Sequence, residues 1–265
     1  IPPPLRVESA AADEEPTLLD TILVDAPSEP PSTDPREVPT ALEPRAEAVY
    51  DIDVPKNERV LRFVDLFSGR LKNYLEEGLS RGAQYLPMIQ DVFRAEGLPL
   101  DLAYVPLVES AFKPSALSRA KARGIWQFMQ GTGLENGLKH DWYIDERAEP
   151  EKATRAAAKY LKTLYTMYGD WHLALAAYNG GPGRVQRAMR RSGRNDFWSL
   201  SASTRYLPRE TREYVPLILA AVMYTLLGRV VLALIVQPDS GNYIWRFFVR
   251  ITDPQVVAEL KEIRA

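Results

Sequence analysis

Apolar residues recur every three or four positions along most of this chain, a spacing that predicts amphipathic helices. The pattern begins after about Pro55, breaks at Gly69 and Gly97, and continues as a long apolar face over residues 153–168 that ends at Gly169. Glycine just after such a face is typical of a helix C-terminus. The chain shows no alternation of strand and helix patterns and no internal repeat. The sequence therefore predicts an all-α core.

Residues 1–45 differ in composition from the rest of the chain. They hold ten of the 21 prolines, and ten acidic side chains against three basic ones. Such a segment buries too little apolar surface to offset the entropy lost on ordering it. We expect residues 1–45 to be a disordered acidic tether. The alternative is that the apolar island around Ile22 docks on a partner or on the domain.

The C-terminal part contains an apolar span, residues 215–236, that raises the question of a membrane helix. Pro216 near one end and a break at Gly228 favour a buried core helix instead, followed by a strand-like segment at 230–236. A loosely alternating stretch and a short helix complete a small C-terminal extension. The chain thus divides into a tether at 1–45, helices packing on the main domain at 46–95, the main domain at 96–228, and an unassigned extension at 229–265.

Composition excludes several kinds of chemistry. The chain has no cysteine, so disulfides, thiol nucleophiles and thiolate metal sites are absent. His140 and His172 lie far apart without metal-ligand spacing, and we expect neither a metal nor a cofactor. Residues 46–265 carry 30 bases against 25 acids, a net charge of +5. This charge suits an acidic polymer such as cell wall or nucleic acid, but it is also ordinary for a soluble domain.

Glu109 is the candidate acid. Asp101 predicts a helix N-cap, and apolar residues at helical spacing place Glu109 on the buried stripe of that helix. Burial against apolar neighbours disfavours the charged form of a carboxyl group and raises its pKa, which suits a proton donor near neutral pH. The alternative is a structural ion pair with Arg119, Lys121 or Arg123, and spacing alone favours that alternative.

Four motifs occur in order along the chain: Glu109-Ser-Ala-Phe with Pro114 and Ser118, Gly124-Ile-Trp-Gln-Phe-Met, Ala177-Tyr-Asn-Gly-Gly-Pro-Gly-Arg-Val, and Glu210-Thr-Arg-Glu-Tyr-Val. In this order, over about residues 54–227, the chain resembles the family 1 lytic transglycosylases, which carry the SLT domain. Within that family it is most similar to the membrane-bound lytic transglycosylase D group. The resemblance implies a lysozyme-like α fold. It also implies non-hydrolytic cleavage of the β-1,4 bond between N-acetylmuramic acid and N-acetylglucosamine, which leaves 1,6-anhydro ends.

The resemblance also implies roles for particular residues. Glu109 is the expected acid and then base, and Tyr214 is the tyrosine whose hydroxyl orients it. The expected substrate-binding residues are Ser118, Gln127, Met129, Tyr178 and Asn179. Core packing remains an alternative for Tyr178 and Met129, and a helix cap for Ser118. Arg123, Gly180 and Pro182 depart from the family's usual residues but remove no matched catalytic position.

One carboxylate is enough for the implied reaction, because the substrate's own N-acetyl oxygen can attack the anomeric carbon. Two other functions stay open: a hydrolase of the goose-lysozyme type, which needs a second carboxylate or an activated water, and a non-catalytic peptidoglycan-binding scaffold. Trp126, Trp142 and Trp171 are candidates for stacking on sugars, with core packing the favoured alternative.

The implied partner is the peptidoglycan glycan strand rather than nucleic acid. Contact with a membrane is expected only through a possible anchor absent from this chain. The implied location is the bacterial periplasm or cell envelope. No basic region followed by an apolar stretch begins the chain at Ile1, so we expect an export signal to be missing or removed.

Overall fold

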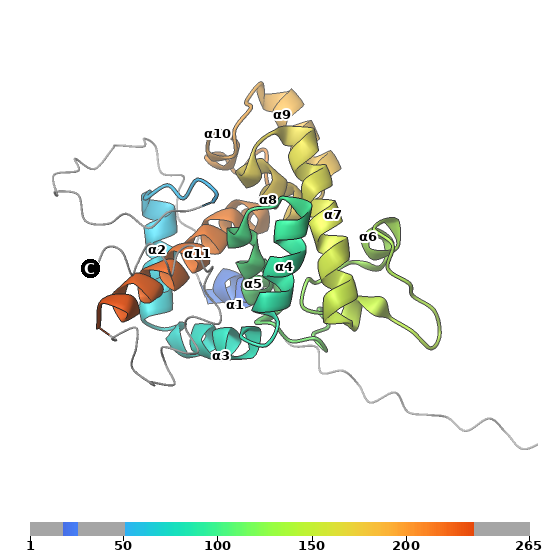
Figure 1. The fold of residues 1–265 in the computed structure, drawn as a ribbon. Helices are drawn as coiled ribbons and strands as arrows, with labels where there is room; N and C mark the ends of the chain where they lie inside the picture. Colours follow the sequence, from blue (N-terminus) through green and yellow to red (C-terminus); the bar gives the residue numbers. More distant parts are fainter. Residues whose placement is uncertain (1–17, 26–50, 236–265) are drawn as a thin grey trace, which may run out of the picture.

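The computed structural model describes residues 18–25 and 51–235, which form helices joined by loops (Figure 1). The α-helices are α1 (Leu18–Asp25), α2 (Glu58–Ser68), α3 (Lys72–Gly82), α4 (Leu86–Glu96), α5 (Val105–Ser110), α6 (Gln130–Glu135), α7 (Pro150–Tyr168), α8 (Trp171–Gly180), α9 (Pro182–Ser192), α10 (Phe197–Ser201) and α11 (Arg209–Ile235). Two 3-10 helices, η1 (Leu100–Tyr104) and η2 (Glu146–Ala148), complete the set. No strand occurs within the described ranges, and the all-α prediction is confirmed.

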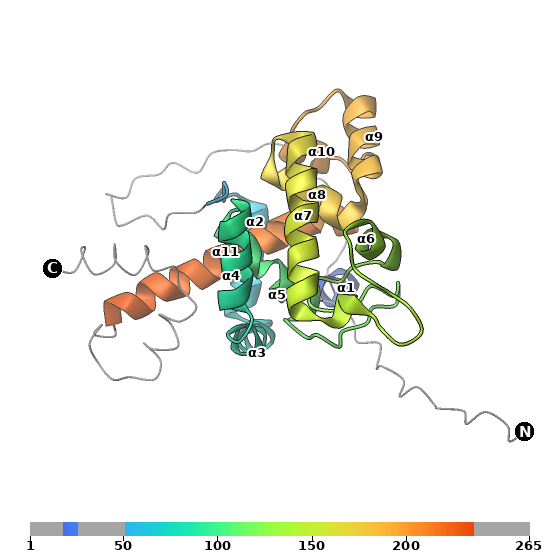
Figure 2. The same cartoon turned by 45° about the vertical axis from the view of Figure 1, so that its right-hand side comes forward.

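The long helix α11 is the centre of the core. It packs against α2, α8 and α5, and it crosses the molecule in both views (Figures 1 and 2). Residues 214–223 are all buried, as a continuous apolar run predicts. Pro216 lies inside this helix and has no N–H for the Arg212 carbonyl. The Arg59 side chain of α2 donates to that carbonyl instead, so a neighbouring helix supplies the missing donor.

The predicted change from helix to strand near Gly228 is wrong for the described residues. α11 continues without interruption to Ile235, past Gly228. A single glycine costs a helix interior only about 1 kcal/mol, and this helix is already held by the packing of its first half. No helix in the described ranges is long and apolar enough to cross a membrane. The rest of the predicted extension, residues 236–265, lies outside the described residues.

The prediction of a disordered tether fails for α1. Leu18, Leu19 and Ile22 are at most 6% exposed, and the helix packs against α5 and α11. The Leu23 carbonyl also accepts a hydrogen bond from Arg209 at 3.4 Å. Composition misses this helix because three apolar side chains within an otherwise polar segment are enough to dock one short helix. The remaining tether residues, 1–17 and 26–45, lie outside the described ranges.

Ile22→Ala is expected to lower the free energy of unfolding by about 2–4 kcal/mol, because it leaves a cavity under a buried side chain. Chemical denaturation followed by circular dichroism measures this effect. Leu61→Ala, at a 40% exposed position on α2, is the matched control and is expected to cost far less. Equal stability of the Ile22→Ala variant and the wild type would restore the tether interpretation.

The segment that carries Glu109 is shorter than predicted. The expected single helix is split into η1 and α5, and the chain leaves α5 at Ala111 and Phe112 with φ of 49° and 58°. Asp101 is not a helix cap: its buried carboxylate accepts hydrogen bonds from the backbone N–H groups of Asp51 at 2.7 Å and Ile52 at 3.1 Å. The result places Glu109 in the last turn of α5, just before the chain reverses.

Candidate active site

Glu109 has the protonation behaviour of a general acid. It is half-buried at the end of α5, and its pKa is raised from 4.5 to about 7, chiefly because burial disfavours the carboxylate. The hydrogen bond from Tyr214 lowers the pKa, while the charge of Glu210 raises it. Within the described residues Glu109 has no cationic partner, and Arg123 faces Asp145 at 3.4 Å instead. The structural ion-pair interpretation is therefore wrong, and a proton is available on Glu109 near neutral pH.

Tyr214 contacts the candidate acid directly. Its side chain reaches Glu109 from α11, and its hydroxyl donates to Glu109 Oε1 at 2.5 Å. Burial raises the Tyr214 pKa well above 10, and the charge of Glu109 adds to this effect. The phenol therefore stays protonated at neutral pH and acts as a donor. It fixes one carboxyl oxygen and leaves the other for a ligand.

Tyr214→Phe is expected to raise the Glu109 pKa further, because it removes the hydrogen bond that favours the carboxylate. A reaction that needs protonated Glu109 declines above this pKa, so the falling limb of the pH–rate profile moves to higher pH. The rate at the optimum is expected to fall about 10- to 100-fold as the acid loses its fixed orientation. Initial rates measured against pH for wild type and Tyr214→Phe test this shift. A falling limb at the same pH in both proteins would contradict a role for the Tyr214 hydrogen bond in setting the Glu109 pKa.

Asn179 lies in a network that joins α8 to the start of α11. Its amide nitrogen donates to Glu210 at 3.2 Å, and its oxygen accepts from the hydroxyl of Thr211 at 2.9 Å. A Cβ at Gly180 would lie only 2.7 Å from the Thr211 hydroxyl oxygen. Because a side chain there would collide with α11, the close packing of α8 on α11 favours glycine at this position. Gly180, a departure from the family pattern, thus has a packing reason. The network fixes Glu210 one turn before Tyr214.

The loop between α5 and α6 holds its backbone in unusual conformations. Every non-glycine residue with positive φ in the described ranges lies here: Ala111, Phe112, Lys121 and Gln127. Such conformations persist only where the surroundings enforce them, and they gather at functional sites. Three of the motif residues, Ser118, Gln127 and Met129, belong to this loop. The strain is an observation independent of the motifs that points to the same segment.

Ser118 and Gln127 are partly buried, and both hold the loop in shape. The Ser118 hydroxyl accepts from the backbone N–H of Ala122 at 3.1 Å, so it closes a turn and does not cap a helix. The Gln127 amide nitrogen donates to the Gly124 carbonyl at 2.9 Å. Neither residue hydrogen-bonds to Glu109 or Tyr214 in the described part of the chain. Their role in binding substrate stays a prediction.

Tyr178 and Met129 differ in their surroundings. The Tyr178 ring packs against Tyr160, with centroids 5.5 Å apart, and its hydroxyl donates to the Trp126 carbonyl at 2.7 Å. Burial raises the Tyr178 pKa, and the nearby charge of Glu109 adds to this. Tyr178 therefore combines packing with a position near the acid. Met129 is 47% exposed at the start of α6, so the core-packing alternative is wrong for it.

Arg147 is a residue that sequence reasoning missed. Its guanidinium donates to the carbonyls of Lys121 at 2.9 Å and Phe128 at 3.1 Å, and to Asp145 at 2.8 Å. One buried side chain thus holds the middle of the strained loop and its C-terminal end. The only signal in the sequence is a charged Asp-Glu-Arg run, which is equally typical of a solvated turn.

Trp126, a candidate for stacking on sugars, and His172, considered as a metal ligand, both lie in the core. Trp126 is fully buried, and its indole N–H donates to Thr154 at 2.9 Å. His172 lies between the Trp198 indole, which donates to Nδ1 at 3.2 Å, and the Asp53 carbonyl, 2.7 Å from Nε2. A neutral ring protonated on Nε2 satisfies both contacts. Both side chains are therefore part of the packed core.

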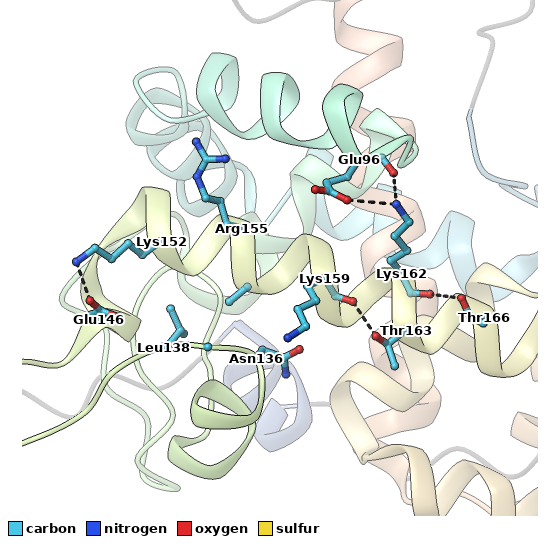
Figure 3. A pocket seen from close by; sticks show the side chains of 12 residues that line it. Glu96, Asn136, Leu138, Glu146, Lys152, Arg155, Lys159, Lys162, Thr163 and Thr166 are labelled. Carbon is cyan, nitrogen blue, oxygen red and sulfur yellow. Dashed lines mark hydrogen bonds and ion pairs between the residues drawn. The ribbon is translucent and has the colours of Figure 1, made fainter.

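A separate depression lies on the outer face of α7 (Figure 3). Its volume is about 790 Å³, and its cations are largely paired: Lys152 with Glu146 at 2.7 Å and Lys162 with Glu96 at 3.2 Å. None of the predicted site residues lines it. This ion-paired surface is therefore distinct from the candidate active site.

Comparisons with known proteins match the segment that holds the candidate site. Residues 90–201 match the family model described as the transglycosylase SLT domain. This match spans Glu109, the strained loop and α8. Over residues 90–201 the chain is therefore similar to the SLT-domain lytic transglycosylases.

Its relatives include a membrane-bound lytic murein transglycosylase D of Escherichia coli, 39% identical over 172 residues that make up 63% of this chain and 37% of that protein. A soluble lytic murein transglycosylase of Salmonella typhimurium is 35% identical over 42% of this chain and 18% of its own length. The crystal structure of the 70 kDa soluble lytic transglycosylase of Escherichia coli is 26% identical over 63% of this chain and 27% of that chain, with a TM-score of 0.48. The chain thus spans little more than a third of the first relative's length.

Proposed function

We propose that this protein is a peptidoglycan lytic transglycosylase that cleaves the β-1,4 bond between N-acetylmuramic acid and N-acetylglucosamine and leaves 1,6-anhydro ends. The observation that carries the proposal is Glu109, a carboxyl group with a pKa of about 7 held by the neutral hydroxyl of Tyr214. Such a group exists in both protonation states near neutral pH. It can therefore serve as an acid and then as a base in one turnover.

In the first step, protonated Glu109 gives its proton to the glycosidic oxygen as the bond to the anomeric carbon breaks. The N-acetyl oxygen of the muramyl sugar attacks the same carbon and holds its positive charge. In the second step, the Glu109 carboxylate takes the proton of the C6 hydroxyl, whose oxygen displaces the N-acetyl oxygen. The acid is restored, and no water is consumed.

The motif residues have specific parts in this proposal. Tyr214 orients the acid, and Ser118, Gln127, Met129, Tyr178 and Asn179 line the path of the glycan. Met129 is exposed enough to contact a ligand, and Tyr178 and Asn179 lie on α8 next to the acid and to Glu210. We further propose that the protein acts in the bacterial cell envelope, where its substrate lies.

A hydrolase is the second candidate, and Glu210 is the observation that favours it. Its charge acts on Glu109, so a second carboxylate is close to the acid and is a candidate to activate a water. Against this role, Glu210 accepts a hydrogen bond from Asn179, which holds it in the helix network.

Incubation with purified peptidoglycan tests the proposal. We expect soluble muropeptides to be released at a rate that depends on protein concentration. A protein that binds the polymer and releases nothing would instead be a scaffold.

A further inference from the structure

The loop between α6 and η2 presents two large aromatic side chains to solvent. Trp142 is 91% exposed and Tyr143 is 92% exposed, and the neighbouring Ile144 is 44% exposed. Single apolar residues on a surface need no explanation, but adjacent aromatic rings left in water mark a contact surface. Figures 1 and 2 show this loop at the edge of the molecule beyond α6.

The aromatic residues sit on a well-defined turn. Asp141 accepts hydrogen bonds on one carboxylate oxygen from the N–H groups of Tyr143 at 2.8 Å and Ile144 at 2.9 Å. Its own N–H donates to the Ile144 carbonyl at 2.8 Å, and His140 and Asp145 form an antiparallel bridge below. The central positions of turns usually hold small or polar residues. The hydrogen bonds of this turn do not involve the aromatic rings. They hold the backbone that carries the rings without the help of a ligand.

The base of this turn is braced against the strained loop. Gln130, next to Met129, hydrogen-bonds to His140 at 3.0 Å. Asp145 pairs with Arg123 at 3.4 Å and with Arg147 at 2.8 Å. The rings therefore extend from a turn whose base contacts the loop that carries three of the predicted substrate-binding residues.

The charges near the turn argue against a lipid surface. Residues 139–146 hold one lysine against Asp141, Asp145 and Glu146. Loops and helices that bind anionic membranes place basic residues beside their apolar side chains. An uncharged sugar ring, with an apolar face and polar edges, suits aromatic faces surrounded by acids and amides.

We propose that Trp142 and Tyr143 form a stacking platform for sugar rings of the glycan strand, away from the bond that is cleaved. The platform rests on the proposed function. It binds long strands, because these extend from the acid to the two rings. Short oligosaccharides end before they reach the rings, so their binding does not depend on the platform.

Steady-state kinetics of the Trp142→Ala/Tyr143→Ala double variant test the platform. With peptide-free glycan strands as substrate we expect KM to rise about tenfold, as for the loss of an aromatic anchor, with kcat within about twofold of wild type. With a tetrasaccharide both constants are expected to stay unchanged. The Trp142→Phe/Tyr143→Phe variant is expected to keep most of the affinity for glycan strands. Met167→Ala, which changes another exposed apolar residue, is expected to keep all of that affinity.

A binding measurement separates failure of the platform from failure of the proposed function. In the Glu109→Gln background, glycan strands are expected to shift the fluorescence of the exposed Trp142 to shorter wavelength, and Trp142→Phe is expected to remove that shift. If wild type cleaves strands but the double variant keeps its KM, the platform is wrong and the function stands. If wild type cleaves nothing but the fluorescence shift is present, the platform stands and the function is wrong. Loss of binding to phosphatidylglycerol vesicles in the double variant, with KM unchanged, would assign the rings to lipid and overturn the platform.

Discussion

Glu109→Gln is expected to lower the release of soluble muropeptides from purified peptidoglycan about a thousandfold, because an amide cannot give a proton to the glycosidic oxygen. The amide has nearly the same size, and it can still accept the hydrogen bond that Tyr214 donates at 2.5 Å. The loss should therefore appear in kcat while binding to the polymer is retained. Initial rates and sedimentation with the insoluble polymer measure the two quantities separately.

Stability provides an internal check on the same variant. The Glu109 pKa is about 7 in the folded protein against an ordinary value of 4.5. The folded state therefore binds more protons than the unfolded state in this interval, and wild-type stability falls as pH rises from about 4.5 through about 7. The Gln variant lacks this titration and is expected to be more stable than wild type above pH 7. Glu77→Gln, at an exposed position on α3, serves as the control and should change neither activity nor this pH dependence.

Gly124→Ala is the second change with a large expected effect. Gly124 has φ of 82°, and a Cβ there would lie 1.8 Å from the Arg147 carbonyl oxygen. An alanine is strained at this positive φ, and the Arg147 backbone can move away from the Cβ only at a large cost in free energy. We expect a loss of at least about 3 kcal/mol in the free energy of unfolding. Activity is expected to fall as well, because the loop that holds Ser118 and Gln127 must rearrange.

Gly131→Ala is the matched control for this loop. Gly131 lies in α6, and a Cβ there meets nothing within 4 Å. Alanine favours a helix over glycine, so this variant is expected to be as stable as wild type or slightly more stable. Thermal unfolding of both variants compares the two sites. Similar stability of the two would mean that the Gly124 contact with Arg147 does not constrain the loop.

Periodicity predicts that Glu109 lies on the apolar side of its helix, and the glycines predict several helix ends of the domain. It does not predict the partner of the acid, since Tyr214 lies 105 residues away on another helix. That pair came from the family resemblance. Neither periodicity nor the family resemblance predicts the role of Arg147. Its hydrogen bonds to two backbone carbonyls depend on the fold and produce no pattern in the adjacent sequence.

The errors of prediction have local physical causes. Asp101 has the residue type of an N-cap, but its carboxylate is taken by two backbone N–H groups of the segment before α2. α1 is hidden in a proline-rich segment whose average composition conceals three buried side chains. α11 continues past Gly228 because the packing of its first half outweighs the cost of one glycine in the helix. In each case a tertiary contact outweighs a local preference.

The most direct test of the proposed function is the chemistry of the new glycan end. Products released from purified peptidoglycan by the wild-type protein are separated and weighed by mass spectrometry, with the Glu109→Gln variant as the blank. We expect muramyl ends that are lighter than the hydrated form by one water, as 1,6-anhydro sugars are. Hydrated, reducing muramyl ends would contradict the account and identify the protein as a hydrolase in which Glu210 is the first residue to test.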